Sequence, residues 1–242
     1  MKSFAIPTTS TLPGNDYEFR MLCEKEMGQL LDFRNLVLSS LSNADHYVKE
    51  QDEAVFVHKH LGPEGFTIGV YSNDELVAYA MLGLPPADET NELADRVDIP
   101  VGHRHLIAHV AGCMVHPAHR GRQLQKLLLA KRIEGARAQG KRYCISMASL
   151  SNHASRRNLL ASGFHIARVT IMEAALKRQL LLLDMVEQPV FDLSSARMAA
   201  AEDYATQQVL TQQGFRGIGE ERDAATRAAP QLVFAKQRKA GP

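Results

Sequence analysis

The sequence has few of the features that mark secreted or membrane proteins. It holds only three cysteines, Cys23, Cys113 and Cys144. None of them forms a CxxC pair, and an odd number cannot complete a closed set of disulfides. The N-terminus lacks an apolar stretch of signal-peptide length, and no run of about 18 apolar residues could span a bilayer. We therefore expect a soluble protein of a reducing compartment, the cytoplasm.

An excess of charge of one sign is also missing. The chain has 28 basic and 27 acidic residues, a formal net charge of +1. Proteins that bind nucleic acids or membranes usually show a basic excess or a basic stripe. Neither partner is therefore expected. With 242 residues, 45% of them hydrophobic, the chain can bury a substantial core.

Hydrophobic periodicity and turn residues predict a mixed α/β chain. Helices are expected at 24–42, 50–61, 122–139, 152–162 and 195–213. Strands are expected at 17–22, 66–72, 75–83, 105–115, 141–148, 164–172, 178–185 and 231–236. Arg34 interrupts the apolar stripe of the first helix and is expected near its edge. Residues 84–104 are polar and acidic after Leu-Pro-Pro, which predicts a long mobile loop and a candidate lid.

The expected domain organisation follows from these elements. Residues 1–16 contain prolines and a Gly-Asn pair and should lie loosely on the surface. Residues 17–186 form the main domain, and 187–242 a helix–strand extension packed on it. NLLASGFHI and VLTQQGFRGI echo each other by placing Gly-Phe after a helix. Gly-Phe is a common helix exit, so we interpret the echo as no true repeat.

The stretch HVAGCMVHPAHRGRQLQKLLLAKR carries the chemical signal. A strand passes through Pro117 and Gly121 into a helix whose start holds Arg120, Arg122 and Lys126. A helix N-terminus presents unpaired N–H groups and the positive end of the helix dipole. These features favour a phosphate or pyrophosphate, and arginines add charge-assisted hydrogen bonds. A doubly anionic group held at a strand end is therefore the expected ligand.

This stretch resembles the GCN5-related N-acetyltransferases, the GNAT family. Their Arg/Gln-x-x-Gly-x-Gly/Ala pattern, after a Val-x-Pro strand end, is matched by residues 120–125 following 115–117. Their later Asn-x-x-Ser/Ala motif, followed by Gly-Phe, is matched by Asn152, Ser155 and Gly163-Phe164. The resemblance covers roughly residues 17–185. It implies an α/β fold (α+β type) with a mixed, mostly antiparallel sheet, splayed central strands and flanking helices.

The resemblance implies that acetyl-CoA, or another acyl-CoA, is the co-substrate, without a metal. Strand 105–115 would splay from strand 141–148 and admit the pantetheine arm. The implied coenzyme-binding residues are Cys113, Met114, Val115, Arg120, Gly121, Arg122, Gln123, Leu124, Gln125, Lys126, Asn152 and Ser155.

The chain departs from the family pattern at three positions. Gln123 stands where the family usually has glycine, and Gln125 where glycine or alanine is common. Small residues there let the backbone approach the pyrophosphate closely, so the glutamines put tight coenzyme binding in question. Many members also carry a tyrosine as general acid four residues after the later serine or alanine. Here that residue is Leu159, so another residue or water must supply the proton.

The mechanism that the resemblance implies is direct attack of an amine on the thioester, assisted by a base. A backbone N–H at Met114 or Val115 would polarise the carbonyl. Strand alternation would place His105, His109 and Cys113 on one face. His109 is the candidate catalytic base, since an imidazole of near-neutral pKa suits proton removal.

Each of these residues also has a plainer interpretation. His109 can be a hydrogen-bonded core histidine, and Cys113 in an apolar strand is more often packing than nucleophile. Asn152 and Ser155 can simply be a helix N-cap and a first-turn residue. The five histidines between residues 103 and 119 match no zinc spacing, so no metal site is expected.

The sequence thus predicts an acyl-CoA-dependent N-acyltransferase whose acceptor is an amine of a small molecule. A non-catalytic acyl-CoA-binding or protein-interaction module on the same fold is the alternative. A third hypothesis is an acceptor on a macromolecule, such as a protein N-terminus, a lysine or an aminoacyl-RNA. Near-neutral charge counts against RNA. For the oligomeric state, a homodimer is possible.

Overall fold

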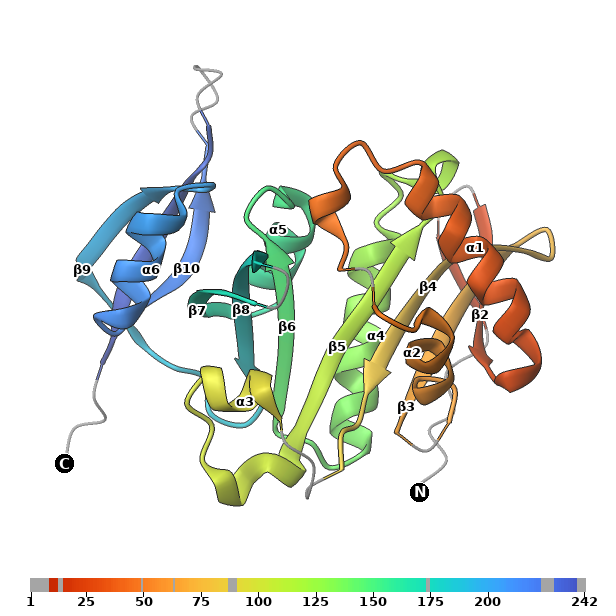
Figure 1. Cartoon of the computed structure of the whole chain (residues 1–242), viewed down its shortest axis with the longest axis horizontal. Coiled ribbons are helices and arrows are strands. Elements are labelled where there is room, and N and C mark those ends of the chain that lie inside the picture. Colours follow the sequence, from red (N-terminus) through yellow and green to blue (C-terminus); the bar gives the residue numbers. More distant parts are fainter. Residues whose placement is uncertain are drawn as a thin grey trace. The chain divides into compact units, whose positions relative to one another are not determined.

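The computed structural model describes residues 9–12, 15–48, 50–62, 64–86, 91–172, 175–222 and 229–238. These residues form two compact units. The N-terminal unit comprises residues 1–90 and 102–142, and the C-terminal unit comprises 91–101 and 143–242. Each unit contains mostly antiparallel strands with helices packed on them (Figure 1). The predicted fold class is confirmed.

The described part of the N-terminal unit has five strands in the order β1-β2-β3-β4-β5, all antiparallel. The strands are β1 (Thr9–Leu12), β2 (Asn15–Leu22), β3 (Gly65–Ser72), β4 (Glu75–Gly83) and β5 (Ile107–Val115). Its helices are α1 (Met27–Ser39), α2 (Glu53–Lys59) and α4 (Leu124–Ala138). Figure 1 shows α1 and α2 in front of these strands and α4 behind them.

Two local signals shape this unit as expected. The β3–β4 hairpin turns at Asn73 and Asp74, whose φ values of 51° and 61° suit a two-residue turn between twisted strands. Leu30, Phe33 and Val37 of α1 form one buried stripe that packs against β4 and the end of β5. This stripe fixes the helix on the sheet face, since burial of large apolar side chains stabilises by about 1.5–3 kcal/mol each.

Arg34 was wrongly expected at the edge of that stripe. Its side chain is only 1% exposed and forms an ion pair with Glu53 of α2. Its guanidinium also donates to the hydroxyl groups of Tyr47 and Tyr79. A buried charge is tolerated only when it is paired and hydrogen-bonded, and this cluster meets both conditions. Arg34 therefore joins α1 to α2 and β4 from inside the core.

Among its described residues, the C-terminal unit has six strands in the order β6-β8-β7-β10-β11-β9. The strands are β6 (Tyr143–Ser149), β7 (His165–Ile171), β8 (Lys177–Asp184), β9 (Phe191–Ala200), β10 (Phe215–Glu221) and β11 (Gln231–Gln237). The helices are α3 (Glu92–Arg96), α5 (His153–Ala161) and α6 (Tyr204–Gln212).

This unit contains an internal repeat, so our interpretation of the Gly-Phe echo was wrong. The segment β6-α5-β7-β8 is followed by β9-α6-β10-β11, with the same order of elements and the same antiparallel pairings. Residues from Met147 to Ile166 correspond, without gaps, to residues 51 positions later. β7 and β10 pair antiparallel, so the two halves are related by an approximate two-fold axis.

Three further sequence expectations need correction. Within the N-terminal segment 1–16, residues 9–12 form β1 and pair with β2, while 1–8, 13 and 14 lie outside the described residues. The expected loop at 84–104 contains α3 and a 3₁₀ turn at Val101–Leu106, and residues 87–90 are not described. The helix expected at 195–213 is a strand up to Ala200 and helical only from Tyr204. The domain boundary at residue 187 stays a prediction.

Candidate functional site

β5 carries a register shift in the middle of the strand. His109 pairs with Gly83 and Val110 with Leu82, but Cys113 pairs with Ala80. Two residues of β5, Ala111 and Gly112, therefore lie opposite a single residue of β4. Such a bulge bends a strand and redirects its carbonyl groups. Arg132 of α4, almost fully buried, donates to the carbonyl of Ala111 at 3.0 Å and stabilises this irregular backbone.

The bulge reverses the expected alternation of side chains. Directly paired residues share a face, and Gly83 and Ala80 lie an odd number of residues apart on β4. His109 therefore points to one face and Cys113 to the other. The expectation that they share a face is wrong, because one extra residue flips every later side chain. His105 lies in the 3₁₀ turn before the strand.

His109 lies beside a second histidine. An ideal Cβ on its partner Gly83 would be 3.1 Å from Nε2 of His60 and 3.4 Å from Cβ of His109. His60 is fixed by a 2.8 Å hydrogen bond between its Nδ1 and the carbonyl of Phe56. Burial, and then the nearby His60, lower the pKa of His109 to about 4. His109 is therefore neutral at pH 7, and a weaker base than the sequence suggested.

The end of β5 is packed rather than reactive. Burial raises the pKa of the Cys113 thiol, although Arg132 opposes this effect. A protonated thiol is a poor nucleophile, which favours packing as the role of this half-buried side chain. The Met114 side chain is buried in the core with α1, and the Val115 carbonyl accepts from Arg120 Nε at 3.4 Å.

The loop after β5 has an unusual backbone. Gly121 has φ of 78°, in the left-handed region that glycine adopts readily. Gln123 also lies there, with φ of 60° and ψ of 12°, at the N-cap of α4. A non-glycine residue in this conformation costs about 1–2 kcal/mol. The structure thus gives a conformational reason for the glycine that the family usually has at this position.

The cations of this loop are held by neighbouring elements. Arg122 donates to the hydroxyl of Tyr17 at 3.1 Å, and the same hydroxyl lies 3.0 Å from Nδ1 of His119. Arg120 donates to Ser40 at 3.4 Å. Burial, then Arg122, lower the pKa of His119. Tyr17, 1% exposed on β2, was missed from the sequence because its partners lie far along the chain.

The start of α4 is electropositive. Its N-cap Gln123 makes no side-chain capping bond, and its first turn, Leu124 to Lys126, has no acidic residue. Leu124 is buried, Gln125 is half-buried and Lys126 is exposed. The sequence has no aspartate or glutamate from residue 99 to 133. The helix dipole and the loop cations therefore act together, as an anion site at a helix N-terminus requires.

The later motif lies in the C-terminal unit, at the start of α5. Asn152 is the N-cap, and its Oδ1 accepts from the Ser155 amide at 3.1 Å. The N-cap interpretation is confirmed. Coenzyme contact by either residue stays a prediction. Leu159 is buried on the inner face of α5.

Across the residues that the structure describes, no group of three or more histidine, cysteine, aspartate or glutamate side chains is placed to hold a metal ion.

A family model described as "Acetyltransferase (GNAT) family" matches residues 35–164, more than half of the chain. The chain belongs to the GNAT family. The match includes β5, the loop, α4 and the motif at Asn152 and Ser155. By family it is an acyl-CoA-dependent N-acyltransferase, whose acceptor the comparisons do not identify. None of the curated proteins compared with the chain matches it in sequence.

Solved structures show the same fold. The GNAT domain of S. lividans PAT is 18% identical, with a TM-score of 0.54, and the match covers 75% of this chain and 99% of that one. YncA from Salmonella typhimurium, solved with its cofactor acetyl-CoA, is 19% identical, with a TM-score of 0.51 and coverage of 73% and 98%. The ribosomal-protein-S18-alanine N-acetyltransferase from Escherichia coli is 12% identical, with a TM-score of 0.51 and coverage of 71% and 95%.

No helix in the described part of the chain is long and apolar enough to span a bilayer. The predicted cytoplasmic location stays a prediction.

Proposed function

We propose that this GNAT protein transfers an acyl group, most simply acetyl, from coenzyme A to an amine of a small acceptor. The observation that carries the proposal is the segment from Val115 to Lys126. It combines a strand end, two left-handed residues and a cationic helix start whose first turn has no acidic residue. A pyrophosphate carries the charge that this arrangement favours.

The proposed coenzyme contacts follow the chain. Backbone groups from Cys113 to Val115 would hold the thioester end, and a strand N–H there would polarise its carbonyl. Residues 120–126 would hold the pyrophosphate, through backbone N–H groups and the side chains of Arg120, Arg122 and Lys126. Asn152 and Ser155 would contact the coenzyme from the start of α5. Acetyl-CoA bound to yncA supports the ligand class.

The reaction would be a direct attack. The amine nitrogen bonds to the thioester carbon and the C–S bond breaks. The coenzyme thiolate takes a proton from a water molecule, since Leu159 replaces the tyrosine of other members, and that water regains a proton from His109 once His109 has taken one from the amine nitrogen. A base of pKa about 4 cannot deprotonate an ammonium of pKa about 10. His109 would therefore act after attack of a neutral amine, by taking a proton from the nitrogen of the tetrahedral intermediate.

Two alternatives have specific support. A non-catalytic coenzyme-binding module is favoured by Gln123 and Leu159, and by the low pKa of His109. A peptide or protein acceptor is suggested by the Escherichia coli neighbour, whose name gives a ribosomal-protein alanine as its acceptor. The near-neutral charge of this chain counts against an RNA acceptor.

Calorimetric titration with acetyl-CoA tests the proposal. We expect micromolar binding by the intact chain and a loss of at least about 100-fold for Arg120→Ala with Arg122→Ala, since charge-assisted bonds contribute about 1.5–3 kcal/mol each. The control pair Lys25→Ala with Arg137→Ala removes the same charge from exposed positions elsewhere and should bind normally.

An assay of thioester cleavage then separates the alternatives. Release of the free coenzyme thiol is measured in the presence of a panel of amines. If acyl-CoA binds but neither small amines nor peptides stimulate release of the thiol, the non-catalytic module is supported. Absence of binding to acetyl-, succinyl- and longer acyl-CoA overturns the proposal.

A further inference from the structure

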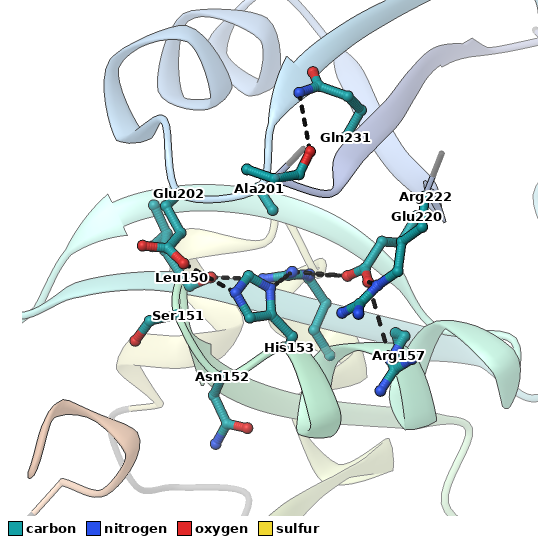
Figure 2. A network of polar contacts seen from close by, with 12 residues as sticks. Leu150, Ser151, Asn152, His153, Arg157, Ala201, Glu202, Glu220, Arg222 and Gln231 are labelled. Carbon is teal, nitrogen blue, oxygen red and sulfur yellow. Dashed lines mark hydrogen bonds and ion pairs between the residues drawn. The ribbon is translucent and has the colours of Figure 1, made fainter. Parts of the chain in front are cut away.

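A buried polar network joins the two repeats of the C-terminal unit (Figure 2). Its centre is Arg156 of α5, whose side chain is fully buried. Arg156 donates from Nε and Nη2 to one carboxylate oxygen of Glu220 on β10, at 3.1 and 2.7 Å. It also donates to the carbonyl of Leu150, just before α5, at 2.7 Å. One side chain thus connects the start of α5 to the second repeat.

Glu220 remains charged although its side chain is only 3% exposed. Burial alone would raise its pKa, but hydrogen bonds from Arg156 and Arg222 outweigh burial and hold the pKa below its usual value. Arg222 binds the second carboxylate oxygen at 3.0 Å, and Arg157 lies 3.9 Å from it. Removal of the charge would leave Arg156 buried without an anion, which is strongly unfavourable.

His153, the first residue of α5, makes the second connection. Its Nδ1 lies 2.6 Å from Arg156 Nη2, and its Nε2 lies 2.9 Å from Glu202 Oε1 (Figure 2). A guanidinium can only donate, so Nδ1 accepts and Nε2 carries the hydrogen that Glu202 accepts. The ring is therefore held at both nitrogens, and Glu202 fixes it from the segment between β9 and α6.

The repeat shows which contacts are specialised. Gln207, the equivalent of Arg156, donates to the carbonyl of Ala201 at 2.9 Å, as Arg156 does to Leu150. This hydrogen bond from the helix to the carbonyl before it is therefore present in both repeats. Glu202 and Glu220, however, correspond to Ser151 and Val169, so the acidic contacts are made in one direction only.

The start of α6 in the second repeat differs from the start of α5 at the proposed coenzyme contact. Asp203 replaces Asn152 as the N-cap and accepts from the Thr206 amide at 3.1 Å. The hydrogen bond from Thr206 lowers the pKa of Asp203, so a carboxylate occupies the positive end of α6. A phosphate would be repelled there.

We propose that Glu202 and Glu220 are positioning residues supplied by the second repeat. They hold the first turn of α5, and with it Asn152 and Ser155, in the geometry that coenzyme binding needs. This inference rests on the proposed function, because it assigns coenzyme contact to the start of α5. The C-terminal repeat thus supports the coenzyme site of the first repeat and binds no coenzyme itself.

Glu220→Gln in the full chain tests this inference, with Glu221→Gln as the matched control at the next, exposed position. Hydrogen exchange of residues 150–160 without ligand should be about tenfold faster in Glu220→Gln, and unchanged in the control. The KM and the dissociation constant for acetyl-CoA should rise about tenfold, while kcat changes less than about twofold. Glu202→Gln, at an exposed carboxylate, should show smaller changes of the same kind and covers the case in which Glu220→Gln does not fold.

The outcomes are distinguishable. If Glu202→Gln and Glu220→Gln both keep normal coenzyme affinity but have a lowered Tm, the acidic contacts only stabilise the unit. This result overturns the inference but not the proposed function. An intact chain that binds no acyl-CoA overturns the proposed function, and with it the coenzyme role of α5. Unchanged exchange at residues 150–160 overturns the positioning claim whether or not coenzyme binds.

Discussion

Ile166 on β7 pairs with Gly217 on β10, and these two residues occupy equivalent positions in the internal repeat. A residue that pairs with its own equivalent must lie on the axis that relates the two halves. A Cβ on Gly217 would lie 2.7 Å from Cδ1 and 2.9 Å from Cβ of Ile166. The close contact at the axis therefore depends on glycine in the second repeat.

Gly217→Ala should destabilise the C-terminal unit by about 1–3 kcal/mol, because the added methyl group overpacks the contact with Ile166. Urea unfolding measures the change. Gly219→Ala is the matched control, since nothing lies within 4 Å of a Cβ at that position. Ile166→Val should recover part of the loss in the double variant. Equal stability of both alanine variants would contradict the close contact.

Tyr17→Phe should weaken acetyl-CoA binding by about fivefold, because Arg122 loses a hydrogen-bonded anchor worth about 1 kcal/mol. Calorimetry measures the affinity. Tyr71→Phe removes a comparable hydroxyl, bonded to Gln29 at 2.9 Å, and should leave binding unchanged. A Tyr17→Phe variant with normal affinity would show that Arg122 needs no support from β2.

Gln123→Gly should bind acetyl-CoA more tightly, by about two- to tenfold. Glycine adopts the left-handed backbone without strain and removes a side chain from the anion site. Gln125→Gly lies within α4 and should instead lower stability by about 1 kcal/mol. Titration and thermal unfolding of both variants separate the two effects. Weaker binding by Gln123→Gly would mean that the glutamine side chain contacts the coenzyme.

Stability should fall as the pH drops from about 6.5 towards 4. The folded-state pKa of His109 and of His165 is about 4, chiefly because of burial, and lies below the ordinary value of 6.5. In that window the unfolded chain binds protons that the folded chain does not, so stability is present above pH 6.5 and lost below it. Each histidine contributes up to ~3 kcal/mol to this loss.

Urea unfolding at pH 7.5 and pH 4.5 measures the dependence. His109→Gln should lose less stability between the two pH values than the unmodified chain. A variant that loses as much as the unmodified chain would show that His109 is not held neutral by burial.

Local patterns predicted much of this protein because their causes are local. Asn73-Asp74 predicted the hairpin, Gly140 the end of α4, and the apolar stripe of α1 its buried face. The segment from Val115 to Lys126 indicated an anion site because the strand end, the turn and the helix start are contiguous in the chain. Family membership followed from the same residues, with the motif at Asn152 and Ser155.

Long-range contacts decided what the local patterns missed. The helix expected at 195–213 was wrong in its first part because Ala196, Met198 and Ala199 favour helices, whereas pairing with β11 makes that segment a strand. The sequence suggested that Arg34 lies at the edge of the apolar stripe, but Glu53 and two tyrosines surround it in the core. The bulge in β5, which separates His109 from Cys113, follows from pairing with β4 and from Arg132, not from any pattern within the strand.

The sequence by itself determined the family and the order of most elements, and it indicated the class of ligand, because backbone propensity, capping and the motif at residues 115–126 act over a few residues. Only the tertiary structure decided how the C-terminal repeat is used. Glutamates are usually exposed, and nothing in the sequence marks Glu202 and Glu220 as special. Their roles arise because the antiparallel pairing of β7 with β10 brings them to His153 and Arg156. Burial of Arg156 and Glu220 makes each of these two charges depend on the other.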